Sequence, residues 1–160
     1  MTNMNNPNQP TTNEVKHEKK EVLIGGLVDL DMAYFRQLEG KDGWIAIGQG
    51  NCRNQNYFTV LSDAGEKLGI VGVYDTDDEE NISHTVVDPK YRGRGLAMKF
   101  KERLMDELGL PFLTLTIDLD NTASIKAAEK IPGIKKVSDK AYEQEFHKAK
   151  YIQESPKEKK

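Results

Sequence analysis

Apolar residues recur at helical spacing in three stretches of the chain. In the range 96–108 they stand four positions apart, and the stretch is followed by a glycine of the kind that ends helices: Leu96, Phe100, Leu104, Leu108 and Gly109. Similar spacing predicts a helix over Val28–Leu38, capped by Asp29 or Asp31. A third helix is predicted from the cap Asp120–Asn121 through Ile131, where a Pro-Gly pair stops it.

Runs of apolar and β-branched residues between these helices predict strands. In chain order the predicted strands are Trp44–Ile47, Tyr57–Leu61, Leu68–Tyr74, Ile82–Val87, Phe112–Leu119, Ile134–Val137 and Tyr142–Tyr151. The strands on either side of the 96–108 helix should run parallel, because a helical crossover joins them. We therefore expect an α/β fold built on one mixed (α+β) sheet, mostly antiparallel with a central parallel pair, and flanked by helices.

Composition divides the 160 residues into one domain and two tails. Residues 1–20 contain five Asn and almost nothing apolar, so we expect a disordered arm there, and residues 152–160 have a similar composition. The domain would then span 21–151. The sequence has neither an apolar run of about 20 residues nor a secretory signal pattern, so we expect a cytoplasmic protein with no membrane partner.

Charge and cysteine content exclude other classes of protein. The single cysteine, Cys52, rules out an internal disulfide, and the three histidines show no paired spacing for a metal, so no metal is expected. Residues 21–151 hold 17 basic and 22 acidic residues, a net charge of −5. Such a domain is a poor general binder of nucleic acid, which requires basic surface to neutralise phosphates.

The most informative stretch is 86–97, where a strand ends, a glycine-rich turn follows and a helix begins. The first amides of a helix attract anions, and small residues let an anion approach the backbone closely. The turn combines small residues with cations: Lys90, Arg92, Gly93, Arg94, Gly95 and Ala97. This pattern predicts a pyrophosphate site. The alternative is an ordinary helix-capping loop with solvated basic residues.

These residues resemble the GNAT superfamily of acyl-CoA-dependent N-acyltransferases. The segment Arg92–Ala97 matches the family pattern Gln/Arg-x-x-Gly-x-Gly/Ala, and it follows a strand that ends in Val87-Asp88-Pro89, as in that family. Downstream, Asn121–Ile125 resembles the second cofactor element, Asn-x-x-Ala/Ser-Ile. The resemblance extends over roughly 57–150 and implies acetyl-CoA as co-substrate.

The resemblance also implies roles for particular residues. The turn and the helix start would hold the pyrophosphate through Arg92, Gly93, Arg94, Gly95, Leu96 and Ala97. Val86 and Val87 would pair with the pantetheine arm as with an added strand, and the Val87 amide would polarise the thioester carbonyl. Asn121 and Ser124 would contact the cofactor, although Asn121 has a competing explanation as a helix cap.

Two departures from the family pattern concern catalysis. Ala128 stands where many members have a tyrosine that protonates the thiolate, and the strand before the turn has no carboxylate that could be the base. His84 is a candidate base, but on a regular strand it faces away from Val87, and only a bulge would turn it round.

Two hypotheses about function follow. One is transfer of an acetyl group from acetyl-CoA to a primary amine by direct attack in a ternary complex. The alternative is a catalytically inactive CoA-binding or regulatory module. The sequence does not identify the acceptor amine, and it leaves the oligomeric state open, with a homodimer as one alternative.

Overall fold

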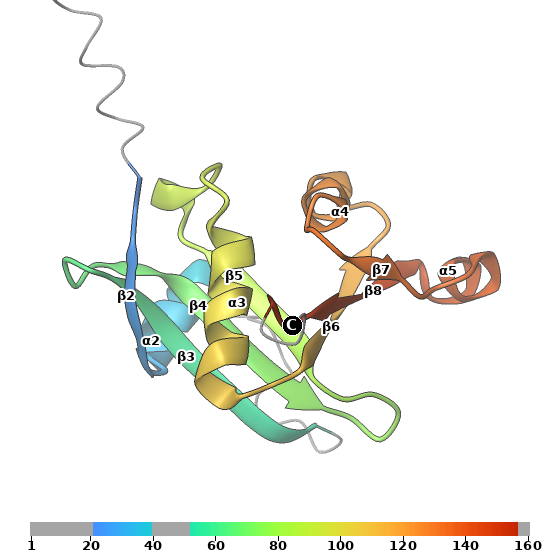
Figure 1. The fold of residues 1–160 in the computed structure, drawn as a ribbon, viewed down its shortest axis with the longest axis horizontal. Coiled ribbons are helices and arrows are strands. Elements are labelled where there is room, and N and C mark those ends of the chain that lie inside the picture. Colours follow the sequence, from blue (N-terminus) through green and yellow to red (C-terminus); the bar gives the residue numbers. More distant parts are fainter. Residues whose placement is uncertain (1–20, 40–51, 157–160) are drawn as a thin grey trace, which may run out of the picture.

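A computed structural model of the chain describes residues 21–39 and 52–156. The predicted arm 1–20 and the predicted strand Trp44–Ile47 lie outside the described residues. Seven strands form one sheet in the order β2-β3-β4-β5-β6-β8-β7 (Figure 1). Their bounds are β2 Ile24–Asp29, β3 Arg53–Ser62, β4 Lys67–Asp75, β5 Ile82–Val87, β6 Phe112–Asp118, β7 Lys135–Lys136 and β8 Lys148–Glu154.

The strand pairings confirm the predicted mixed sheet. Every neighbouring pair is antiparallel except β5 and β6, which run parallel. Those two strands pair at a single position, where Ile82 faces Thr114, and then diverge (Figure 1). The parallel pair therefore opens into a wedge in the middle of the sheet.

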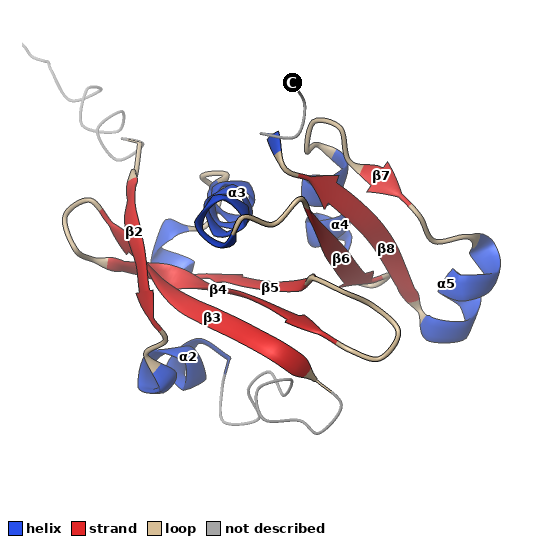
Figure 2. Ribbon diagram, turned by 60° about the horizontal axis from the view of Figure 1, so that its bottom comes forward, coloured by secondary structure: helices blue, strands red, loops and turns tan. Residues whose placement is uncertain are grey.

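Helices cover both faces of the sheet. Helix α2 (Met32–Glu39) lies on one face, and α3 (Leu96–Leu108) and α4 (Thr122–Glu129) lie on the other (Figure 2). A short 3₁₀ turn, η2 (Pro89–Tyr91), precedes α3, and α5 (Lys140–Phe146) precedes β8. None of the helices in the described ranges is long and apolar enough to span a membrane.

Helix α3 has the predicted bounds and buries the predicted face. Leu96, Phe100, Leu104 and the neighbouring Met105 are at most 2% exposed and join the larger apolar core of the sheet. Gly109 ends the helix in the left-handed conformation, and its amide donates to the Met105 carbonyl. A glycine adopts this conformation without the steric cost that a Cβ brings.

The predicted helix over Val28–Leu38 begins too early. Val28 belongs to β2, where it pairs with Thr59 of β3, and the helix begins only at Met32. Of the two candidate caps, Asp31 is the one used, because its carboxylate accepts the Tyr34 amide at 3.1 Å. Apolar spacing alone could not show that pairing with β3 holds the first residues extended.

The predicted strand Tyr142–Tyr151 is also wrong in its first half. Those residues form α5, which Asp139 caps by accepting the Tyr142 amide at 2.8 Å. The chain becomes a strand only after His147, which is left-handed at a φ of 57°. Strand β8 then continues to Glu154 and buries Gln153, so the tail predicted from residue 152 starts too early.

Candidate active site

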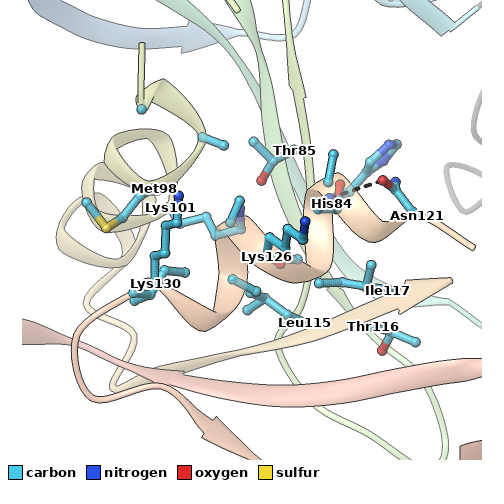
Figure 3. A pocket seen from close by; sticks show the side chains of 18 of the residues that line it. His84, Thr85, Met98, Lys101, Leu115, Thr116, Ile117, Asn121, Lys126 and Lys130 are labelled. Carbon is cyan, nitrogen blue, oxygen red and sulfur yellow. Dashed lines mark hydrogen bonds between the residues drawn. The ribbon is translucent and has the colours of Figure 1, made fainter. Parts of the chain in front are cut away.

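The wedge between β5 and β6 leads into a cleft of about 710 Å³. Residues from both strands and from the facing parts of α3 and α4 line it (Figure 3). They include Ser83 and Thr85 of β5, Leu115 of β6, and Ala97 of α3. The cleft therefore opens where two strands separate, because the hydrogen bonds that would join them end after one residue pair.

Backbone alternation decides which groups of β5 face this cleft. The Asp88 amide donates to Leu68 of β4, and the Thr114 amide of β6 donates to the Asn81 carbonyl. In a strand, the N–H and C=O groups of one residue point toward the same neighbouring strand. The backbone groups of even-numbered β5 residues therefore point toward β4, and those of odd-numbered residues point toward β6. The backbone of Val87 therefore points toward β6, although Val87 is not among the residues that line the cleft. The structure does not bring Val86 there, because its backbone faces Ile70 of β4.

The glycine-rich turn leaves the start of α3 open. Gly93 and Gly95 have φ angles of 81° and 74°, and a Cβ at either position would meet no atom within 4 Å. Gly95 is the N-cap of α3 and offers no side-chain bond to the first amides. The amides of Leu96 and Ala97 are therefore available to an anion, while the Leu96 side chain itself is buried in the core.

Local bonds hold the turn in this shape. The buried carboxylate of Asp88 accepts the Lys90 amide at 3.0 Å and the Tyr34 hydroxyl at 2.7 Å. Burial opposes ionisation of Asp88, but these two bonds and the charges of Lys90 and Arg92 together hold the pKa of the carboxyl below its usual value. Arg92 donates its Nε to the Val87 carbonyl at 3.0 Å, and Arg94 lies over the Tyr91 ring. Tyr34, on α2, is a positioning residue that the sequence did not reveal.

One polar atom of the cleft lacks a partner. The hydroxyl of Thr85 is buried, and it has no hydrogen bond to any residue in the described ranges. A buried hydroxyl without a hydrogen bond destabilises the fold. Its position beside a cleft therefore points to a polar ligand that supplies the missing hydrogen bond. The open glycines and this hydroxyl together fit a long ligand with an anionic part and an amide-bearing arm, as a CoA thioester has.

The predicted contacts from α4 reach the cleft as well. Asn121 and Ser124 both line it. The Asn121 side chain already accepts the Ser124 amide at 3.1 Å, which is the capping role given above as its competing explanation. Ala128 is 3% exposed and packs in the core, so this position supplies no hydroxyl.

His84 lies on a regular strand, and the bulge that would have turned it round is absent from β5. Its ring packs edge-on against Phe35 and Tyr57 on the α2 side of the sheet. The Tyr57 hydroxyl lies 3.3 Å from Nδ1, and burial lowers the pKa of the imidazole to about 4. His84 also contributes to the lining of the cleft, so it lies where the wedge connects the two faces.

Glu39 is a second residue that sequence reasoning missed. Its carboxylate lies 3.8 Å from Nε2 of His84, at the end of α2, and burial raises the pKa of this carboxyl. The two residues are far apart in the sequence, and no motif connects them. The strand before the turn has no carboxylate, but a helix on the α2 face places one beside His84.

Three exposed side chains with metal-ligating atoms gather at the end of β6. Atoms of Asp118, Asp120 and His147 lie within 4.8 Å of one another. Ion pairing accounts for this group, since His147 lies 3.1 Å from the Asp120 carboxylate and that contact raises the pKa of its imidazole. The cluster gives no ground for a metal site.

Comparisons with known proteins agree with this geometry. A family model described as an acetyltransferase (GNAT) domain matches residues 30–132. An uncharacterized protein of Mycobacterium leprae is 27% identical over 128 residues, which cover 73% of this chain. The chain spans about a third (36%) of the length of that relative.

Solved structures with the same fold include acetyltransferases. A chimera of a Vibrio cholerae spermidine N-acetyltransferase and hSSAT superposes with a TM-score of 0.59 at 15% identity, covering 82% of this chain and 96% of the other. A Bordetella pertussis protein whose name assigns it to the GnaT acetyltransferases superposes with a TM-score of 0.55 at 20% identity, covering 85% and 99%. At these identities the likeness shows the fold alone.

The splayed parallel pair and the open helix start agree with the family match over residues 30–132. The chain belongs to the acetyltransferase (GNAT) domain family. This confirms the family and the fold class predicted from the sequence.

Proposed function

We propose that the protein transfers an acetyl group from acetyl-CoA to a primary amine by direct attack in a ternary complex. The observation that carries the proposal is the cleft between β5 and β6, where the open start of α3 and the unpartnered hydroxyl of Thr85 face the same space. Acetyl-CoA supplies the acetyl group as a thioester, which an amine can attack without a covalent enzyme intermediate.

The turn before α3 would hold the pyrophosphate. The amides of Leu96 and Ala97 lie at the positive end of the helix dipole, and Gly95 leaves the approach to them free. Arg92 has five N–H donors and uses one on the Val87 carbonyl, so donors remain for a phosphate oxygen. Arg94 adds a second positive charge to the same turn.

Strand β5 would hold the pantetheine arm and polarise the thioester. The backbone of Val87 and the hydroxyl of Thr85 both face the wedge and could bond to the amides of the arm. The Val87 amide donor would also stabilise negative charge on the carbonyl oxygen, as an oxyanion-hole donor does. Asn121 and Ser124 would close the cleft from the side of α4.

His84 and Glu39 would receive the acceptor amine on the opposite face. Burial lowers the pKa of the imidazole to about 4, so it is neutral but weakly basic at pH 7, and it would accept a proton from an ammonium group only with help from a nearby negative charge. The Glu39 carboxylate, 3.8 Å away, would stabilise the imidazolium once it forms. Since position 128 is an alanine, the departing thiolate would either take a proton from another group or, with an ordinary pKa of about 8–9, leave without one.

A thermal-shift titration with acetyl-CoA tests the binding half, with CoA, ATP and NAD as comparisons. At about 100 times its dissociation constant, a ligand stabilises the fold by roughly 2.7 kcal/mol. Stabilisation by CoA compounds alone supports the cleft, whereas no shift in a folded sample would overturn it. This titration measures ligand binding only, so the cytoplasmic location and the domain boundaries expected from the sequence stay predictions.

An amine panel then tests the catalytic half, with release of free CoA thiol as the readout. The panel should include spermidine, because the solved structures of this fold include variants of a Vibrio cholerae spermidine N-acetyltransferase. Turnover with one amine class supports the enzyme. Binding of acetyl-CoA with no turnover on any amine favours the alternative, a catalytically inactive CoA-binding or regulatory module. The alanine at position 128 is consistent with this alternative.

A further inference from the structure

Lys101 is a cation of the cleft that the functions proposed above leave unused. It lies on α3 one turn after Ala97, and both residues line the cleft. Figure 3 shows its side chain in the space between α3 and α4. Across the described ranges, no hydrogen bond or ion pair involves its ammonium group.

An ammonium group without a partner in a desolvated position is costly. Burial accounts for the pKa of Lys101, which falls to about 8. Most of the population is therefore charged at pH 7, but the charge is held at a cost that an anion would remove.

The groups that face Lys101 do not neutralise it. Lys126 of α4 and Lys130, which caps the end of that helix, line the cleft opposite (Figure 3), and His84 on β5 is neutral at pH 7. Asp118 is the single carboxylate among the described residues of the lining, and its oxygen already accepts the Asp120 amide at 2.8 Å. The space between α3 and α4 thus has a net positive charge.

Lys101 is also displaced from the helix start. It stands four positions after Ala97, which corresponds to about 6 Å along the helix axis. Its side chain enters the space between α3 and α4 (Figure 3), where a second anionic group would meet it more directly than the anion bound by the first amides of α3.

We propose that Lys101 binds an anionic group of the acyl-CoA other than its pyrophosphate. The inference rests on the proposed function. Two parts of such a molecule have this chemistry: the 3′-phosphate of the nucleotide and a terminal carboxylate on a dicarboxylic acyl group. If the carboxylate is the partner, Lys101 makes the enzyme selective for dicarboxylic acyl groups.

Isothermal titration of the full chain distinguishes the two sources. The ligands are CoA against dephospho-CoA, and succinyl-CoA against acetyl-CoA, each with wild type and Lys101→Met. If Lys101 binds the 3′-phosphate, Lys101→Met should weaken the binding of CoA at least tenfold and leave that of dephospho-CoA unchanged. If it binds the carboxylate, the variant should weaken the binding of succinyl-CoA at least tenfold and leave that of acetyl-CoA unchanged. Lys99→Met is the matched control, since Lys99 lies on the same helix but is exposed and pairs with Glu21.

Proton uptake gives a readout that a structural role would not produce. An anion beside Lys101 raises its pKa, so binding at pH 8 should take up about half a proton, measured in two buffers of different ionisation enthalpy. Lys101→Met should lose this uptake, and Lys99→Met should keep it. A melting curve checks folding, and Lys101→Met should melt at or above the wild-type temperature.

The outcomes separate the two proposals. If wild type binds CoA compounds and Lys101→Met binds all four ligands equally well with unchanged proton uptake, the role of Lys101 is overturned and the proposed function stands. If wild type binds none of them, both proposals are overturned.

Discussion

The hydroxyl of Tyr34 lies 2.7 Å from the Oδ2 atom of Asp88 and donates to it, joining α2 to the turn before α3 across the sheet. The Asp88 carboxylate spans the junction, since its other oxygen accepts the Lys90 amide. A helix on the α2 face therefore positions a loop that serves the cleft on the other face.

Replacing Tyr34 with Phe should weaken both the fold and acetyl-CoA binding. The substitution removes the hydroxyl that donates to one oxygen of a buried carboxylate, which costs about 1–3 kcal/mol of unfolding free energy. Urea denaturation measures this loss, and titration calorimetry measures the affinity. Tyr142→Phe on α5, whose ring packs on Phe146 away from the turn, is the control and should change neither value. An unchanged stability in Tyr34→Phe would contradict the anchoring role.

A bulky residue at Gly95 should abolish acetyl-CoA binding with a modest loss of stability. A Cβ at Gly95 would project into open space, so Gly95→Leu adds backbone strain of about 1–2 kcal/mol and blocks the approach to the first amides of α3. Gly65 in the β3–β4 turn has a similar φ of 88° and equal space. Gly65→Leu should thus melt at a similar temperature and bind acetyl-CoA like wild type. Wild-type affinity in Gly95→Leu would remove the turn from the site.

Thr85→Val should bind acetyl-CoA more weakly than wild type while its fold stays equally stable or becomes more stable. The valine has the same shape and lacks the buried hydroxyl that has no partner, so the free energy of unfolding should stay equal or rise by up to about 1–2 kcal/mol. The dissociation constant of acetyl-CoA should rise, because the hydroxyl is no longer there for the ligand.

Thr59→Val provides the contrast to this substitution. The Thr59 hydroxyl accepts the Asp31 amide at 2.8 Å, so its removal leaves that amide without a partner and should destabilise the fold. Denaturation and calorimetry on both variants decide the point, and a destabilised Thr85→Val would show that its hydroxyl is satisfied in the free protein.

Stability should fall on the acid side of neutrality through His84. Its pKa is about 4 in the folded protein and about 6.5 when unfolded, so between these values the unfolded chain binds the extra proton. Stability is therefore complete above pH 6.5 and decreases by up to about 3 kcal/mol as the pH falls to 4. Unfolding measured across this range should show that slope in wild type and a reduced slope in His84→Phe.

His147 should behave in the opposite sense. The Asp120 carboxylate raises the pKa of its imidazole, so its contribution is present below the unfolded pKa and disappears as the pH rises through the folded one. It is an exposed group, and His147→Gln should keep the acid-side slope that His84 causes. If His147→Gln loses that slope, the slope comes from His147 and its assignment to His84 is wrong.

Glu39→Gln should lower the rate of acetyl transfer more than it changes acetyl-CoA affinity. The amide keeps the shape but cannot stabilise an imidazolium on His84, 3.8 Å away. Rates across pH with a fixed amine measure the effect, and Glu107→Gln near the C-terminal end of α3 is the control, since Glu107 is exposed and does not line the cleft. Equal kcat in Glu39→Gln and wild type would exclude the pair from proton transfer.

The sequence by itself determined the elements whose signals are local. Helix α3 could be predicted to the residue, because a four-residue apolar spacing and a terminal glycine both act within the helix. The turn at 92–97 could be recognised for the same reason, since its glycines and its position between a strand and a helix are neighbours in the chain. The parallel pair followed from the crossover between β5 and β6.

Only the tertiary structure decided which of these residues act together. Pairing with β3 holds Val28 in a strand, and strand alternation turns the backbone of Val87 toward β6 and that of Val86 toward β4. The contacts of Tyr34 with Asp88 and of Glu39 with His84 join residues about 50 positions apart. Such contacts depend on how the helices pack on the two faces of the sheet, and a linear pattern has no spacing that records this packing.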